Sequence, residues 1–116
     1  MTGRSKRKGD RAEREVERLL GDLLGVPIRR KLGAGRRDDI GDIDGVPNTV
    51  VQVVDWRDVS AAVSQKPVEA ERQRLEFERL LGEPAYAATF VRLRGGKFRV
   101  CLTPEQWFAY WRATVS

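Results

Sequence analysis

The residue types that could do chemistry in this chain are carboxylates and basic side chains, because it contains no histidine. That absence removes the usual imidazole general base, the Ser/His and Cys/His dyads and most zinc sites. The single cysteine, Cys101, cannot form an internal disulfide, and we interpret it as a buried small apolar residue. Any hydrolysis would therefore depend on carboxylates that hold a hard cation such as Mg²⁺, with help from a lysine.

Basic side chains are concentrated at the start of the chain. Residues 1–37 carry 12 Lys/Arg against 5 Asp/Glu, whereas residues 38–116 carry 10 against 12. This asymmetry favours contact with a polyanion, most simply DNA, through salt-sensitive phosphate contacts that do not read sequence. An acidic protein surface as the partner, or a merely solvated basic surface, are the alternatives. The candidate phosphate-binding residues are Arg4, Lys6, Arg7, Lys8, Arg11, Arg29, Arg30, Lys31, Arg36 and Arg37.

The elements that position these side chains fit one domain, since 116 residues are too few to divide into two. Residues 1–9 are polar and lack periodicity, which is typical of a mobile basic tail, and the domain is predicted over 10–116. No apolar run approaches the roughly 20 residues that span a bilayer, and no signal-peptide segment follows the basic start. We therefore expect no membrane contact and no secretion by a signal peptide.

A helix is predicted from Asp10, whose spacing to Glu13 is that of a capping box, to Gly25 and Pro27. Strands are predicted over 26–32 and 38–43, on either side of a glycine and arginine turn at 33–37. The valine-rich segment Asn48–Trp56 is expected to be the central strand of the sheet, because its β-branched residues suit burial on both faces.

In the second half, Pro67 suits the first turn of a helix that ends at Leu81, while 57–66 is ambiguous. Strands over 86–93 and 97–102 are joined by Gly95-Gly96 as a hairpin. Thr103, Pro104 and Gln106 then make a capping box that starts a helix reaching about Arg112. The predicted order is α-β-β-β-α-β-β-α.

Four aromatic residues crowd into five positions of this last helix. Trp107 and Trp111 share one face and are expected in the core. Phe108 or Tyr110 must then be more exposed, which indicates either a subunit or partner contact or ordinary partial exposure.

The predicted order, with GDIDGVPNTVVQVV in its middle, resembles the Holliday-junction resolvase-like branch of the PD-(D/E)XK nucleases, small stand-alone members of which are familiar in bacteriophages of actinobacteria. The likeness spans most of the chain. It includes the basic start KGDRAERE of the first helix, the Gly41-Asp42-Ile43 element, the Gly45-Val46-Pro47 turn, the apolar strand, and the closing hairpin and helix. It implies an α/β fold with a restriction-endonuclease-like core, in which helices flank a mixed central sheet.

In that family a helical glutamate, the aspartate of the Gly-Asp-Ile element and a strand Glu-x-Lys pair form the catalytic centre. Glu13 and Asp42 match the first two, but Gln52 and Val54 stand in the Glu and Lys positions. Glutamine brings no negative charge to a Mg²⁺ site, and valine can neither contact the scissile phosphate nor take a proton. No metal or cofactor is therefore expected. If the centre were active, Mg²⁺ would be held by Glu13, Asp42 and Gln52.

Each of these positions has a second interpretation. We favour Glu13 as the capping-box residue over Glu13 as a ligand, and Asp42 could equally belong to a solvated acidic turn with Asp38, Asp39 and Asp44. Asp55 cannot restore the site, because on a regular strand it faces away from Gln52 and Val54. A displaced cation could come from Lys66 or Arg57.

Two functions follow from this resemblance. In the first, a catalytically degenerate resolvase-fold protein serves as a structural or DNA-contacting component of a bacteriophage virion, in the head-to-tail region. In the second, it is an active Mg²⁺-dependent structure-specific endonuclease, a Holliday junction resolvase with a displaced lysine. We favour the first, because both charges that the reaction needs are missing from the strand. We expect a homo-oligomer or assembly into a larger particle, in the host cytoplasm or the assembled virion.

Overall fold

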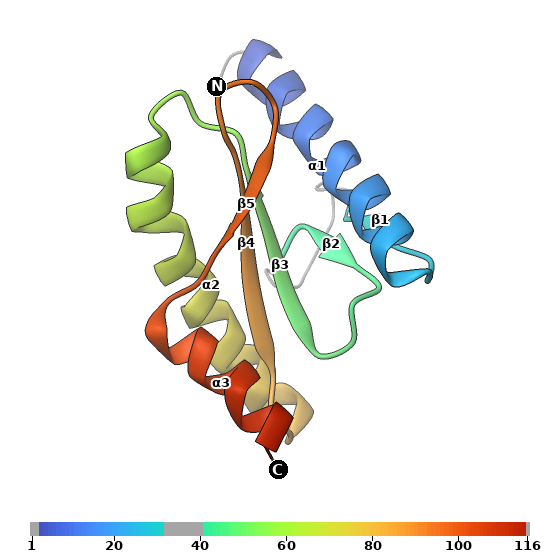
Figure 1. Ribbon diagram of the computed structural model, residues 1–116, viewed down its shortest axis with the longest axis vertical. Helices are drawn as coiled ribbons and strands as arrows, with labels where there is room; N and C mark the ends of the chain where they lie inside the picture. The colour runs from blue at the N-terminus through green and yellow to red at the C-terminus, as the bar shows by residue number, and fades with distance from the viewer. Residues whose placement is uncertain (1–2, 32–40, 116) are drawn as a thin grey trace.

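The computed structural model describes residues 3–31 and 41–115, with side chains from Lys8 onward. Within these residues the elements follow the order expected from the sequence. They are α1 (Gly3–Leu24), β1 (Arg29–Arg30), β2 (Ile43–Asp44), β3 (Thr49–Val54), α2 (Val59–Leu81), β4 (Tyr86–Arg92), β5 (Phe98–Cys101) and α3 (Pro104–Val115). The fold is α/β, with a mixed sheet flanked by helices (Figure 1).

The main sheet has the strand order β3-β4-β5. β3 and β4 run parallel, with Thr49 opposite Tyr86 and Val54 opposite Val91, whereas β4 and β5 form the antiparallel hairpin predicted at Gly95-Gly96. The central strand is β4, so the expectation that the valine-rich strand would be central is wrong. β3 is buried on both faces because helices cover them, and this burial does not require a neighbouring strand at each of its two edges.

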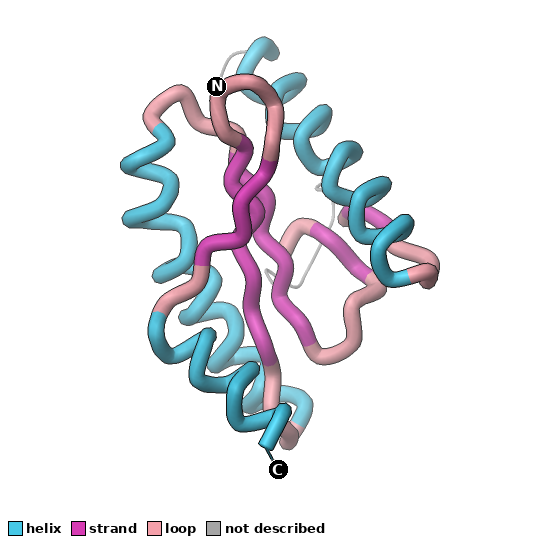
Figure 2. The backbone as a smooth tube through the Cα atoms, in the orientation of Figure 1, coloured by secondary structure: helices cyan, strands magenta, loops and turns pink. Residues whose placement is uncertain are grey.

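Apolar side chains fill both faces of the sheet, one beneath α1 and the other beneath α2. Figure 2 shows helices on both sides of the strands. On one face Val16 and Leu20 of α1 pack with Val51 of β3 and Phe90 of β4. On the other face two smaller clusters contain Val50 with Ala70 and Ala87, and Val54 with Ala62 and Val91. Successive residues of β3 therefore point alternately toward α1 and α2.

The first helix starts earlier than the sequence predicted. α1 begins at Gly3, so the segment interpreted as a tail contributes its first turns, and Asp10 lies inside the helix. Asp10 forms an ion pair with Arg30 at 3.6 Å instead of capping the helix, and the capping-box interpretation of Asp10 and Glu13 is wrong. Lysine and arginine are good helix formers, and the Lys8–Asp55 ion pair fixes this end to the sheet. The predicted end at Gly25 is confirmed, with φ of 68°.

The second helix also starts earlier. α2 begins at Val59, because Asp58 is its N-cap and accepts a hydrogen bond from the Ala61 N–H at 3.0 Å. Pro67 lies within the helix and is buried, so the predicted start at Pro67 is wrong. The segment 57–66, which is ambiguous from the sequence, contains this cap and the first turns of the helix.

The first two strands are shorter than predicted. β1 contains only Arg29–Arg30 and β2 only Ile43–Asp44, and they pair antiparallel with each other. Most of the strand predicted over 38–43, the turn at 33–37 and the side chains of Arg36 and Arg37 lie outside the described residues. Among the described helices, none has both the length and the apolar character needed to cross a bilayer.

Candidate nucleic-acid interface

Val54, which the resemblance aligns with a catalytic lysine, is a core residue. It is 3% exposed and packs with Ala62 of α2 and Val91 of β4, with Val59 and Cys101 at the margin of the cluster. An isopropyl group surrounded by apolar side chains can neither donate to a phosphate nor exchange a proton with water. This position is structural.

Gln52, which the resemblance aligns with a catalytic glutamate, belongs to a buried amide network. Its Nε2 donates to Oε1 of Gln73 on α2 at 2.7 Å, and the same oxygen accepts from the N–H of Gly41 at 3.0 Å. Gly41 has φ of 75°, and a Cβ there would lie 2.9 Å from the Val51 carbonyl oxygen, so only glycine fits so close to β3. The network fastens the segment before β2 to α2.

Asp42 lies at the edge of β3 that β4 does not occupy. Its N–H donates to the Val51 carbonyl at 2.7 Å, and its Oδ2 accepts from the N–H of Val53 at 2.9 Å. Through these bonds Asp42 takes the place of a neighbouring strand. The Asp42 carboxylate is half-buried and bonded to the backbone. It therefore belongs neither to a solvated acidic turn nor to a metal-ligand position that is open on all sides.

Glu13 and Gln52 lie on opposite sides of the sheet. Glu13 belongs to α1, which packs Val16 on the face of Val51, whereas the Gln52 side chain points to α2. In the described part of the chain, no three acidic or cysteine side chains are grouped closely enough to hold a metal ion. The described residues therefore do not place Glu13 on the same side of the sheet as the Gln52 side chain, as the Mg²⁺ site implied by the resemblance would require.

The basic residues predicted to bind phosphate divide into two groups. Beside β1, Arg30 pairs with Asp10 and Lys31 with Asp44 at 3.5 Å, so acidic side chains offset their charges. Arg29 and Arg11 are exposed. The other group is at the start of α1, where Arg4, Lys6, Arg7 and Lys8 occupy the first turns.

One end of the molecule gathers basic side chains from four elements. The start of α1, the loop leading into α2, the carboxyl end of β4 and the β4–β5 turn lie together at the top of Figure 1. We define the basic end by the cations that line its hollows, which are Lys8, Arg57, Arg92 and Arg94. Lys97 is exposed in the same turn as Arg94.

Two adjoining hollows are cut into the basic end. The deeper one measures about 210 Å³ and is bordered by Trp56 besides these four cations. A more open depression shares Arg57, Val59 and Arg94 with it. Carboxyl ends of parallel strands are where open α/β sheets place ligands, and β3 and β4 both end here.

Asp55 holds part of this wall in place. Its side chain is 7% exposed, and its oxygens lie 3.6 Å from Lys8 Nζ and 3.8 Å from an Arg92 guanidinium nitrogen. Arg92 also contacts Glu15 of α1 at 3.4 Å. Asp55 lies on the α1 side of the sheet, opposite Gln52 and Val54, as predicted. By contrast, Arg57 and Arg94 are exposed and form no ion pair within the described residues.

Sequence reasoning missed Arg92, Arg94 and Lys97 as interface residues, because they lie in the half of the chain with the lower net charge. The Arg-Gly-Gly-Lys turn after a strand was a usable signal, since a hairpin exposes such residues. Arg57 was noted only as a displaced cation. Lys66, the other displaced candidate, pairs with Glu69 at 3.3 Å and lies over the Trp56 ring at 5.4 Å.

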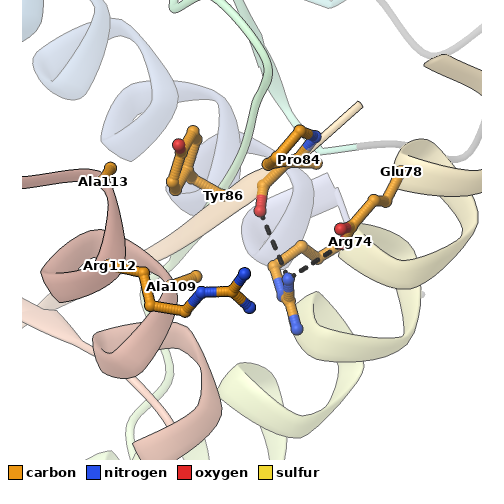
Figure 3. Close-up of a pocket in the computed structure, with 8 residues that line it drawn as sticks. Arg74, Glu78, Pro84, Tyr86, Ala109, Arg112 and Ala113 are labelled. Atoms are coloured by element: carbon orange, nitrogen blue, oxygen red, sulfur yellow. Dashed lines mark hydrogen bonds and ion pairs between the residues drawn. The ribbon is translucent and has the colours of Figure 1, made fainter. Parts of the chain in front are cut away.

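A separate hollow of about 190 Å³ lies between α2, α3 and the start of β4 (Figure 3). Its Arg74 is buried and hydrogen-bonded to Glu71, Glu78 and the Ala85 carbonyl, and the Glu71 hydrogen bond raises the pKa of Arg74. These bonds join α2 to β4. Arg112 projects from α3 toward this group.

The aromatic residues of α3 do not lie as predicted. Trp107 and Trp111 are 59% and 46% exposed, so their assignment to the core is wrong. Tyr110 lies inward, stacked on Tyr86, with its hydroxyl donating to the Ala87 carbonyl at 3.0 Å. It is therefore poorly placed as a partner contact, whereas Phe108 is 47% exposed as expected. The helix is anchored by Gln106 and Tyr110, which leaves the tryptophans on the outside.

No protein-family model, curated protein or solved structure matches the chain.

Proposed function

We propose that the chain is a catalytically degenerate resolvase-fold protein that contacts DNA through its basic end. The observation that carries this proposal is the pair Arg57 and Arg94, two exposed guanidinium groups without an ion pair in the described residues, beside a hollow at the ends of two parallel strands. An arginine without an ion pair binds a phosphate more favourably than a paired arginine, because no carboxylate has to be displaced first.

The positions matching the family's catalytic centre support a binding role. Val54 is enclosed by apolar side chains, and Gln52 is committed to Gln73. Neither change leaves a group that could activate water or neutralise a leaving oxygen. The expected activity is therefore binding without cleavage.

The test is fluorescence anisotropy of labelled duplex and four-way junction DNA across a salt series. We expect the logarithm of the binding constant to fall linearly with the logarithm of the salt concentration. The slope should be about −0.9 for each phosphate contacted. Arg57→Gln/Arg94→Gln should reduce that slope by about two. The matched control is Arg72→Gln/Arg112→Gln, which removes the same charge from exposed positions on the second half of α2 and on α3, and should leave the slope unchanged.

Two outcomes would contradict the proposal. If both double variants reduce the salt slope equally, net charge alone attracts DNA. If the protein binds no DNA at all, an acidic protein surface is favoured as the partner. Incubation of the junction with Mg²⁺ or Mn²⁺ separates the alternative function: cleavage that disappears in Asp42→Ala would establish an active resolvase.

The resemblance to phage proteins extends the proposal to a place in the virion, at the head-to-tail region where DNA passes through protein rings. Particles purified from infected cells should then contain the chain in a fixed ratio to other structural proteins. Its recovery only with free DNA would overturn the virion placement and leave the DNA contact intact.

A further inference from the structure

The deeper hollow of the basic end contains an aromatic ring among its cations. Trp56 follows β3 directly and is 37% exposed, and it borders the same hollow as Lys8, Arg92 and Arg94. Arg57, Val59, Leu93 and the carboxylate-bearing Asp55 complete the lining. An intact duplex keeps the faces of its bases stacked inside the helix, so the ring of Trp56 could stack on a base only where the strand is unpaired.

From this juxtaposition we infer that the hollow receives an unpaired base of single-stranded nucleic acid, stacked on Trp56, with the flanking phosphates on Arg57 and Arg94. The inference rests on the proposed function and names its substrate class. Sequence-tolerant binding of single strands combines a basic track for the backbone with aromatic side chains for the bases, and both components are present here.

The dimensions of the site support a single base. A hollow of about 210 Å³ is smaller than the roughly 300 Å³ at the lower limit of pockets for drug-sized ligands, so one planar ring suits it better than a whole nucleotide. Lys66 lies over the indole at 5.4 Å and pairs with Glu69, so a base would stack on the face of the ring that Lys66 does not cover.

The surrounding ion pairs keep the site preformed. Asp55 holds Lys8 and Arg92, and Glu15 holds Arg92 from α1, so the wall is ordered before a ligand arrives. Arg57 and Arg94 have no such restraint in the described residues and can follow a flexible backbone. A stacked base between a rigid wall and two adaptable arginines explains why the tryptophan is not buried.

The experiment compares an oligothymidylate of about 12 nucleotides with a duplex of equal length by anisotropy. Trp56→Ala should weaken single-strand binding by roughly 5- to 150-fold and change duplex binding by less than about twofold. Trp56→Phe should retain most of the single-strand affinity, because the ring is kept. Trp107→Ala, which removes an exposed indole from α3, is the matched control and should change neither.

A second measurement does not depend on the folding of the alanine variant. In Trp107→Phe/Trp111→Phe, Trp56 is the remaining indole, and its fluorescence should be quenched saturably by the oligothymidylate and much less by the duplex. Absence of quenching despite single-strand binding, or equal losses for both ligands in Trp56→Ala, would overturn the stacking site and leave the basic end as a DNA contact. Failure of every nucleic acid to bind would overturn the proposed function itself.

Discussion

At the scale of single residues, positions 52 and 54 make structural contacts where the resemblance implies a Glu-x-Lys pair. Gln52 keeps a polar side chain but uses it to bind Gln73, and Val54 contributes to the apolar cluster under α2. Glutamate and lysine introduced at these positions are therefore not expected to create a reactive centre, because the surrounding side chains fit an amide and an isopropyl group.

Val54→Lys tests this interpretation through stability. An ammonium enclosed by Ala62 and Val91 has no partner, so we expect the free energy of unfolding to fall by about 3 kcal/mol or more in urea titrations. Val100→Lys is the matched control, since Val100 lies on β5 with 51% exposure, and it should stay within about 0.5 kcal/mol of the unmodified protein. A stable Val54→Lys protein would mean that the position opens to solvent.

Tyr110 provides a pH-dependent test. Burial raises the pKa of its hydroxyl, so the folded protein keeps a proton that the unfolded chain loses near pH 10. The contribution of the Tyr110 hydroxyl to the free energy of unfolding is fully present below about pH 10. It declines as the pH rises toward the higher pKa of the folded state. Tyr110→Phe loses the hydrogen bond to Ala87, about 1 kcal/mol at neutral pH, and this difference should shrink above about pH 10. A difference that stays constant in urea titrations to pH 11 would contradict the assignment.

At the scale of elements, those with local signals were predicted well. The Gly95-Gly96 hairpin and the end of α1 at Gly25 are set by backbone conformations that glycine permits. The capping box of α3 is confirmed in both directions, because Thr103 N–H donates to Gln106 Oε1 and Gln106 N–H donates to Thr103 Oγ1. The starts of α1 and α2 were predicted too late, because residues 1–9 lack apolar periodicity and residues 57–66 are ambiguous from the sequence alone.

Gln106 joins α3 to α2 and gives a prediction at this scale. Besides the capping bond, its Nε2 donates to the Pro67 carbonyl at 2.8 Å, and the residue is fully buried. Gln106→Leu removes the bond to the Pro67 carbonyl and leaves the half-buried Thr103 N–H without its acceptor, so it should lower the free energy of unfolding by roughly 2 kcal/mol. Thr103→Ala removes one capping acceptor and should lower it by about 1 kcal/mol. Equal losses in urea titrations would show that the link to Pro67 contributes nothing.

At the scale of the whole molecule, the site was the least predictable part. Charge counts along the chain placed the basic surface in residues 1–37, yet the hollow combines Lys8 with Arg57, Arg92 and Arg94. Only the parallel pairing of β3 with β4 brings these residues to one end. The same pairing determines that β4 is central, which the apolar pattern of β3 could not reveal.

The late position of β4 in the chain has a consequence for biosynthesis. β3 pairs with a strand that follows the whole of α2, so a nascent chain that has not yet reached Tyr86 has no main-sheet neighbour for its valine-rich segment. Contacts between such distant residues form slowly, and the apolar strand stays accessible to other chains in the meantime. Most of the chain must therefore emerge from the ribosome before β3 and β4 can pair and complete the fold.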